Sequence, residues 1–417
     1  MKIRISAFLF LLSMICVSVL NAQSSDWLWA KTFGGPNSNR INDYADASDG
    51  ARVIECDTEG NIYMAGVMID TAYADQIKIP SFGDFDIMVV KLNPTGKVLW
   101  ATSIGSQNFD CVTGLSLDGQ GNAYICGIFY GTMNLSGMSI SANYGREMFV
   151  AKISPDGVWQ WIRQSKNDIS SKEEGYTNAI IPFDIVTNSQ GISVMRCQYL
   201  GQVNLGSVSF PNTQDPAFCM AGIDSDGTWK WAIDFHDLIP NQAVSSLAIN
   251  LVKDDHLILV GSSSIPELDE SPAIVDSVSN EPTDEDQAVA PNRPDKSPNS
   301  QIFIAKYDLA GSKLWIVNYT NIYGDDPGSI GSVITDYDDN IYFSGYLEAN
   351  AQFGNILVDG EYSNFLARAD SLGNVVWAKA ISKYCYSPIE DDLDSPEQLD
   401  LGIAQDKFLF LAMRYNN

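Results

Sequence analysis

Residues Asp86 to Trp100 read DIMVVKLNPTGKVLW, which is an apolar run, a turn with Pro and Gly, and a second run that ends on tryptophan. Two short apolar runs on either side of such a turn predict a β-hairpin. Four similar stretches follow, and they end at Trp161, Trp231, Trp315 and Trp377. Recurrence at a spacing of roughly 60–85 residues predicts one supersecondary unit that is repeated in space.

Each hairpin is preceded by a second recurring pattern. In the first repeat the strand "ARVIECD" starts at Ala51, the turn "TEGN" follows, and "IYMAGVM" is the next strand. Asp, Asn and Gly recur in these turns because they tolerate the positive φ of a tight hairpin. Each repeat therefore predicts four short strands, and the five whole repeats are expected at about 51–101, 110–162, 178–232, 243–316 and 329–378.

The two ends of the chain carry complementary parts of a sixth repeat. Residues 27–34 match the tryptophan strand, whereas residues 399–415 supply only the first two strands. We therefore predict an all-β fold in which residues 23–417 form a single β-propeller domain of about six four-stranded blades. Its incomplete last blade, residues 399–415, is closed by the N-terminal strand, because an open array would expose sheet edges. Seven blades are the alternative.

The repeat also resembles a known family, the SBBP-type bacterial beta-propeller repeat of exported Bacteroidetes proteins. The first copy keeps the residues of that pattern, which are Asp57, Gly60, Asn61, Tyr63, Gly66, Asp86, Lys91, Gly96 and Trp100. The third copy departs from it, with Gly222 where Lys is expected. The resemblance covers about residues 26–415 apart from one insert, and it implies a propeller. It implies no shared catalytic residues.

Residues 1–22 have the pattern of a signal peptide. Lys2 and Arg4 form a basic start, an apolar core follows, and Ala22 precedes a plausible cleavage point. No other run reaches the roughly 18 apolar residues that a spanning helix needs. We therefore expect export without a membrane span, to the periplasm, the cell surface or the extracellular space.

The charge of the chain excludes some partners. Asp and Glu outnumber Lys and Arg by 52 to 25 among the 417 residues, which gives a formal net charge of −27. Such a surface argues against nucleic acid and anionic lipid as partners. Residues 262–300 are rich in Pro, Ser, Asp and Glu and have no aromatic residue, so they are predicted to be a disordered acidic insert.

The mature chain has six cysteines. Four of them, Cys56, Cys126, Cys197 and Cys219, fall within predicted strands and are expected to be buried apolar groups. Cys111 and Cys385 fall in loops and could pair only if the ring brings their repeats together. The sequence contains no CxxC motif, so the cysteine spacing does not indicate a metal site.

The residue types that carry chemistry show no recognisable pattern. The two histidines, His236 and His256, lack ligand spacing, and the Asp-rich turns complete no EF-hand pattern. Motifs for a serine nucleophile, a phosphate-binding loop or a zinc protease do not occur. The repeated tryptophans are interpreted as blade-to-blade packing residues. The sequence therefore predicts no catalytic, cofactor-binding or metal-binding residue, and no cofactor.

These observations favour an exported, non-enzymatic β-propeller that serves as a binding or structural module. We expect a monomer with an unidentified protein or glycan ligand. The alternative is a propeller enzyme, a hydrolase or lyase, that acts on polysaccharide. Fold alone does not choose between the two, but carboxylates clustered at one mouth of the central channel would favour the enzyme.

Overall fold

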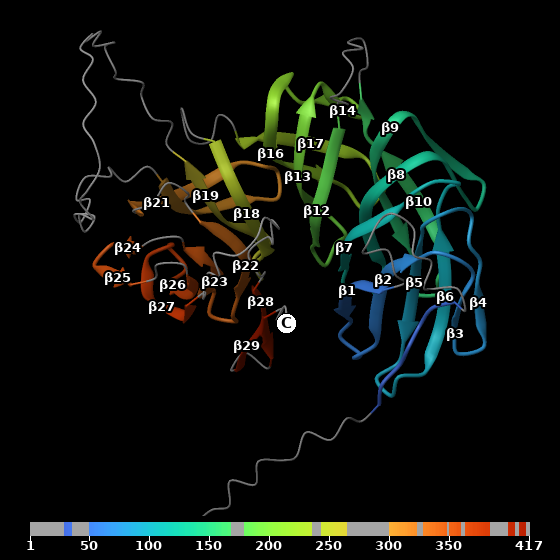
Figure 1. Cartoon of the computed structure of the whole chain (residues 1–417), viewed down its shortest axis with the longest axis horizontal. Coiled ribbons are helices and arrows are strands. Elements are labelled where there is room, and N and C mark those ends of the chain that lie inside the picture. The colour runs from blue at the N-terminus through green and yellow to red at the C-terminus, as the bar shows by residue number, and fades with distance from the viewer. Residues whose placement is uncertain are drawn as a thin grey trace, which may run out of the picture.

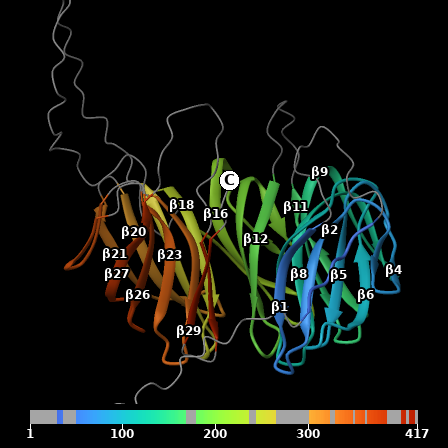
Figure 2. The same cartoon turned by 60° about the horizontal axis from the view of Figure 1, so that its bottom comes forward.

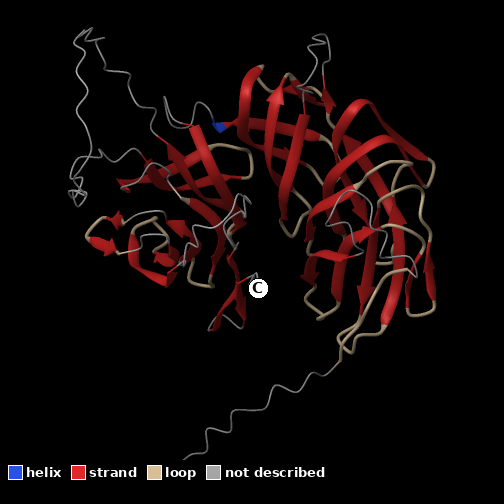
Figure 3. Cartoon of the chain, viewed as in Figure 1, coloured by secondary structure: helices blue, strands red, loops and turns tan. Residues whose placement is uncertain are grey.

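The computed structural model describes residues 29–35, 50–167, 179–235, 243–264, 300–322, 328–347, 350–359, 363–383, 399–404 and 408–413. These residues form antiparallel sheets and no α-helix, which confirms the all-β prediction (Figure 3). None of them belongs to a helix long and apolar enough to cross a membrane. The signal segment 1–22 and residues 265–299 of the predicted insert lie outside the described residues.

The first three large sheets each have four strands. The first sheet contains, in spatial order, β1 (Gly50–Cys56), β2 (Ile62–Met68), β5 (Asp86–Leu92) and β6 (Val98–Ile104). The second contains β7 (Cys111–Leu117), β8 (Ala123–Leu135), β9 (Met138–Ile153) and β10 (Trp159–Gln164). The third contains β12 (Ala179–Thr187), β13 (Ser193–Gly201), β16 (Thr213–Ile223) and β17 (Trp229–Asp234).

The remaining strands form two further large sheets and three small ones. The fourth sheet contains β18 (Ala243–Leu251), β19 (His256–Ser264), β20 (Ser300–Asp308) and β21 (Lys313–Ile322), extended by β24 (Ala351–Phe353) and β25 (Ile356–Val358). The fifth contains β22 (Ser329–Thr335), β23 (Ile341–Leu347), β26 (Ser363–Ala369) and β27 (Val375–Lys383). The small sheets are β28 (Leu399–Ala404) with β29 (Phe408–Met413), β3 (Ala72–Ala74) with β4 (Ile77–Ile79), and β11 (Lys166–Asn167) with β14 (Val203–Leu205) and β15 (Val208–Ser209).

The sheets stand side by side around a common centre, so the arrangement is propeller-like (Figures 1 and 2). The first strands of successive sheets contact one another in the order β1, β7, β12, β18, β22 and β28. We call these six the inner strands. The described strands do not close into a ring, so the number of blades and the closure are not confirmed.

The expected strand partner of the C-terminal hairpin is not found. Among the described residues, β29 pairs only with β28, and residues 29–35 pair with neither, contrary to the prediction. The N-terminal stretch instead lies against the first sheet, where Gly34 bridges Tyr73 and Lys31 pairs with Asp75 at 2.6 Å. The indole N–H of Trp29 donates to the carbonyl oxygen of Pro94 at 3.2 Å, which holds this stretch against a turn of the first sheet.

The hairpin over residues 86–100 is confirmed. Strands β5 and β6 pair antiparallel, and the turn closes where the N–H of Gly96 donates to the carbonyl oxygen of Asn93 at 2.9 Å. Gly96 has a φ of 78°, a conformation that favours glycine.

The tryptophans join neighbouring sheets, as predicted. The indole N–H of Trp100 donates to the carbonyl oxygen of Pro155 in the second sheet at 2.8 Å. Trp161 makes the same contact with Ser225 in the third sheet at 2.9 Å. The rings of Trp100 and Trp161 also pack against Gly157 and Gly227 in the turn of the next sheet, so each of these two tryptophans packs one sheet against the following one.

The departure at Gly222 has a steric explanation. A Cβ atom at Gly222 would lie 2.4 Å from the indole of Trp231. The third sheet therefore has no room there for the lysine found at Lys91 and Lys152, because the tryptophan ring fills the space.

The cysteines divide into buried and accessible groups. Cys126, Cys197 and Cys219 are fully buried, as predicted, and Cys111 is buried and unpaired. Cys385 lies outside the described residues. Cys56 is exposed, contrary to the prediction, because β1 ends the series of sheets and no described sheet covers that face of it.

Candidate functional site

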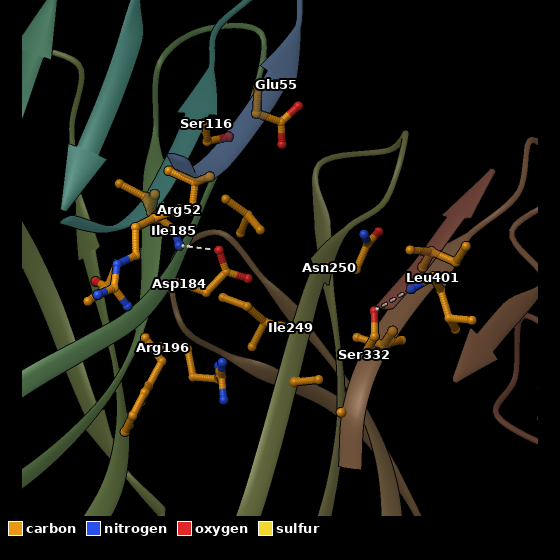
Figure 4. Close-up of a pocket in the computed structure, with 18 of the residues that line it drawn as sticks. Arg52, Glu55, Ser116, Asp184, Ile185, Arg196, Ile249, Asn250, Ser332 and Leu401 are labelled. Carbon is orange, nitrogen blue, oxygen red and sulfur yellow. Dashed lines mark hydrogen bonds between the residues drawn. The ribbon is translucent and has the colours of Figure 1, made fainter. Parts of the chain in front are cut away.

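A cavity of about 620 Å³ lies at the centre of the molecule (Figure 4). All six inner strands contribute to its wall. We call this cavity the channel pocket. Its chemistry is set by polar residues that come from separate sheets, among them Arg52, Glu55, Ser116, Asp184, Arg196 and Asn250.

A β-bulge in each of the first five inner strands shapes this wall. At each bulge one residue has no partner in the neighbouring strand, and the five are Arg52, Thr113, Phe183, Ser245 and Gly331. A bulge re-aims the side chain of its extra residue. Four of the five, all except Ser245, line the channel pocket, and three of these, Arg52, Thr113 and Phe183, have a side chain, so the bulges contribute to its lining.

Glu55 is the residue with the most unusual acidity in the channel pocket. Its pKa is raised from the usual 4.5 to about 7. Burial among the walls of the pocket is the main cause, and the negative charge of Asp184 adds to it, while the N–H of Cys56 opposes the shift. The side chain of Glu55 is nevertheless exposed to solvent, so the pKa shift is attributed to the walls around it and to Asp184 rather than to close packing.

Asp184 and Arg196 form the charged wall of the third sheet. Asp184 accepts a hydrogen bond from the N–H of Ile185 at 2.8 Å. Burial lowers the pKa of Arg196, the nearby Asp184 raises it, and the guanidinium stays charged. Its Nη1 donates to the carbonyl oxygen of Leu247, and its guanidinium lies 5.2 Å from the centre of the Phe183 ring. The Nε of Arg196 is buried without a hydrogen-bond partner in the described part of the chain.

The opposite wall is polar and uncharged. Thr335 donates from Oγ1 to Oδ1 of Asn250 at 3.2 Å, and the N–H of Leu401 donates to the hydroxyl of Ser332 at 3.3 Å. Figure 4 shows Asn250, Ser332 and Leu401 facing Asp184 and Arg196 across the pocket. Hydroxyl and amide groups opposite charged groups can orient a polar ligand.

The channel pocket contains one group of the kind that acid–base chemistry uses, the carboxyl group of Glu55. A carboxyl group with a pKa near 7 both donates and accepts protons at neutral pH, which is what a general acid or base requires. Within the described ranges, no three His, Cys, Asp or Glu side chains gather as metal ligands would.

The sequence pointed to none of these residues, although a signal was present. At the position of Glu55, three residues after the bulge, the second, third and fifth inner strands have Ser116, Val186 and Ile334. A single acid at a position that is otherwise small or apolar could have been noticed. It would have required knowing where the bulges fall.

Comparisons with known proteins give only structural likenesses. No protein-family model matches the chain, and no curated protein matches it. A solved protein of unknown function from Bacteroides caccae matches with 10% identity and a TM-score of 0.36, covering 80% of this chain and 82% of its own. The polysaccharide lyase Uly1 matches with 11% identity and a TM-score of 0.41, covering 88% and 74%. A lignostilbene dioxygenase from Pseudomonas brassicacearum matches with 11% identity and a TM-score of 0.37, covering 80% and 66%.

The prediction of a non-enzymatic binding or structural module is contradicted. Enzymes, including the lyase and the dioxygenase, are among the structures that the chain matches. At such identities and TM-scores, the likeness concerns the fold and assigns no reaction to this chain.

Proposed function

We propose that this protein is an enzyme that cleaves polysaccharide in the channel pocket, as a hydrolase or a lyase. The observation that carries the proposal is Glu55, a carboxyl group with a pKa of about 7 that faces the pocket near a second carboxylate, Asp184. A strongly shifted pKa in a cavity is a marker of functional sites.

The chemistry of glycosidic cleavage suits these two groups. Breaking the bond requires a proton for the leaving oxygen, and a carboxylic acid of raised pKa is the usual donor. Asp184 helps to keep the proton on Glu55, since two neighbouring carboxylates resist being ionised together. Glu55 therefore acts as the proton-transfer group, and Asp184 as the residue that tunes it.

A comparison of two acid-to-amide variants tests the proposal. The protein is incubated with a panel of neutral and acidic polysaccharides, and new chain ends are measured. We expect Glu55→Gln to lose at least about 100-fold in rate. The matched control, Asp359→Asn, removes an exposed carboxylate that does not line the pocket and should leave the rate unchanged. Full activity of Glu55→Gln, or no cleavage of any polysaccharide by the wild type, would overturn the proposal.

We also propose that the ring closes with a sixth blade that contains β28 and β29. Ile54, which lies two residues after its bulge, is 66% exposed. The residues at the same position in the second, third and fifth sheets, Leu115, Ile185 and Val333, are no more than 4% exposed. A neighbouring sheet on β1 would cover Ile54 in the same way and would complete the wall beside Glu55.

The sequence supports a location and a family for this enzyme. Residues 1–22 support export, and the repeat pattern supports membership of the SBBP-type propeller proteins. We propose a monomer that meets its glycan outside the cytoplasm. Fractionation of cells followed by size-exclusion chromatography of the mature chain tests both points.

A further inference from the structure

We infer that the channel pocket takes a polysaccharide whose sugars carry carboxylate groups, that Arg52 binds one such carboxylate, and that the bond is cleaved by elimination. The inference rests on the proposed function, because it specifies the substrate and the reaction of that same site.

The first observation is the state of Arg52. It is the bulge residue of β1, its side chain is exposed, and it lines the channel pocket. No hydrogen bond or ion pair occupies its guanidinium within the described ranges. Arginine presents a rigid fork of donors that fits a carboxylate, so a free arginine in a cavity is suited to an anionic group.

The second observation is the charge balance of the channel pocket. Its charged residues are Arg52, Arg196, Asp184 and Glu55. With Glu55 ionised, as the elimination below requires, two positive charges balance two negative ones, so the pocket is neutral inside a protein of net charge −27. Asp184 compensates Arg196, which leaves the charge of Arg52 for a ligand. A cavity that is far less negative than the rest of the protein is the place where an anionic substrate is least repelled.

A carboxylate on the sugar ring opens a route that a neutral sugar lacks. When Arg52 neutralises the carboxylate, the hydrogen on the adjacent ring carbon becomes acidic. Ionised Glu55 takes that proton, the bond from the next ring carbon to the glycosidic oxygen breaks, and a carbon–carbon double bond forms between the two carbons. Glu55 then gives the proton to the leaving oxygen. No water is consumed and no other reactant is needed.

The test combines two substrates with four proteins. Polygalacturonate and its carboxyl-reduced, neutral counterpart are offered to the wild type, Arg52→Gln, Arg52→Lys and the control Lys313→Gln. Lys313 is an exposed cation on β21 that does not line the pocket. The readouts are new chain ends, the ultraviolet absorbance of the new double bond, and the dissociation constant of an oligogalacturonide, which is measured in each variant with Glu55→Gln added to prevent turnover.

The wild type should cleave only the acidic polymer and should produce the double bond. Arg52→Gln should weaken binding by about tenfold or more, because a hydrogen bond to a charged group contributes 1.5–3 kcal/mol. Arg52→Lys should recover part of this loss, and Lys313→Gln should match the wild type.

The two proposals fail in different ways. Cleavage of the neutral polymer at an equal rate, or unchanged binding in Arg52→Gln, would overturn the inference about the substrate and leave the proposed function standing. New chain ends without the double bond would overturn elimination in favour of hydrolysis. Absence of cleavage of both polymers would overturn the inference, whereas the proposed function fails only if the whole polysaccharide panel is also left intact.

Discussion

The indole N–H of Trp100 and the carbonyl oxygen of Pro155 are joined by a hydrogen bond of 2.8 Å between two successive sheets. The ammonium group of Lys91 reaches the same oxygen at 3.4 Å. Trp161 and Lys152 repeat this arrangement on the carbonyl oxygen of Ser225. In both places one backbone carbonyl oxygen accepts hydrogen bonds from a tryptophan and a lysine of the preceding sheet, so this contact recurs between successive sheets.

Removal of the indole N–H of Trp100 should weaken the contact between the first and second sheets. We expect Trp100→Phe to lower the free energy of unfolding by about 1–3 kcal/mol, through one hydrogen bond and some packing. Urea denaturation measures the change, with the half-exposed Val376→Ala as the control, which should stay within about 0.5 kcal/mol. Equal stability of Trp100→Phe and the control would show that the tryptophans do not hold the sheets together.

A comparison of two glycines separates the cost of backbone strain from the cost of a steric clash with Trp100. Gly157 and Gly137 have φ of 80° and 85°, so alanine should cost about 1 kcal/mol at each. A Cβ atom at Gly157 would also lie 2.9 Å from the ring of Trp100, whereas one at Gly137 meets nothing within 4 Å. Gly157→Ala should therefore lose at least about 1 kcal/mol more than Gly137→Ala in thermal or urea unfolding. Equal losses would mean that the ring of Trp100 moves aside freely.

A buried acid between the first two sheets should make stability depend on pH. Asp110 is fully buried, and burial raises its pKa from 3.8 to about 7, to which the charge of Asp86 adds. Its carboxyl group accepts hydrogen bonds from the N–H and hydroxyl of Ser106 and from the N–H of Tyr130, which partly oppose the shift.

The folded state therefore holds a proton that the unfolded state has lost, so stability falls as pH rises from about 4 to about 7. The slope from this group is about 1.4 kcal/mol for each pH unit. Asp110→Asn mimics the protonated acid and should flatten the slope in urea unfolding between pH 5 and pH 7. An unchanged slope in Asp110→Asn would mean that the acid keeps an ordinary pKa.

Closure of the ring would make the stability of the protein depend on the side chain of Ile54. If a sixth blade covers it, Ile54→Ser should cost about 1.5–3 kcal/mol of stability, the value of a buried side chain of this size. The matched control is Leu372→Ser, because Leu372 has the same exposed fraction of 66% but lies in a turn. If both variants have the same free energy of unfolding as the wild type, the ring is open at β1.

The parts of the fold that were predictable from the sequence are local. The hairpin over residues 86–100 follows from two short apolar runs and from a glycine at the turn between them, which lie within a few residues of each other. The role of the tryptophans followed from their recurrence. In contrast, the loss of lysine at Gly222 depends on the position of the Trp231 ring, which the repeat pattern does not contain.

The candidate site was not predictable for a different reason. Arg52, Asp184 and Asn250 come from three sheets and are far apart in the sequence, so no motif contains them. Their orientation depends on bulges, and a bulge shifts the alternation by one residue without leaving a composition signal. The raised pKa of Glu55 depends on the walls around it and on Asp184, which are tertiary features.

The titration of Glu55 is the decisive measurement, because the proposed chemistry requires a carboxyl group that is half-protonated near neutral pH. It can be measured by carbon NMR of glutamate labelled at the side-chain carboxyl, with the signal assigned by its loss in Glu55→Gln. We expect a midpoint at about pH 7 in the wild type and a lower midpoint in Asp184→Asn. A midpoint at the usual 4.5 in both proteins would contradict the proposed function.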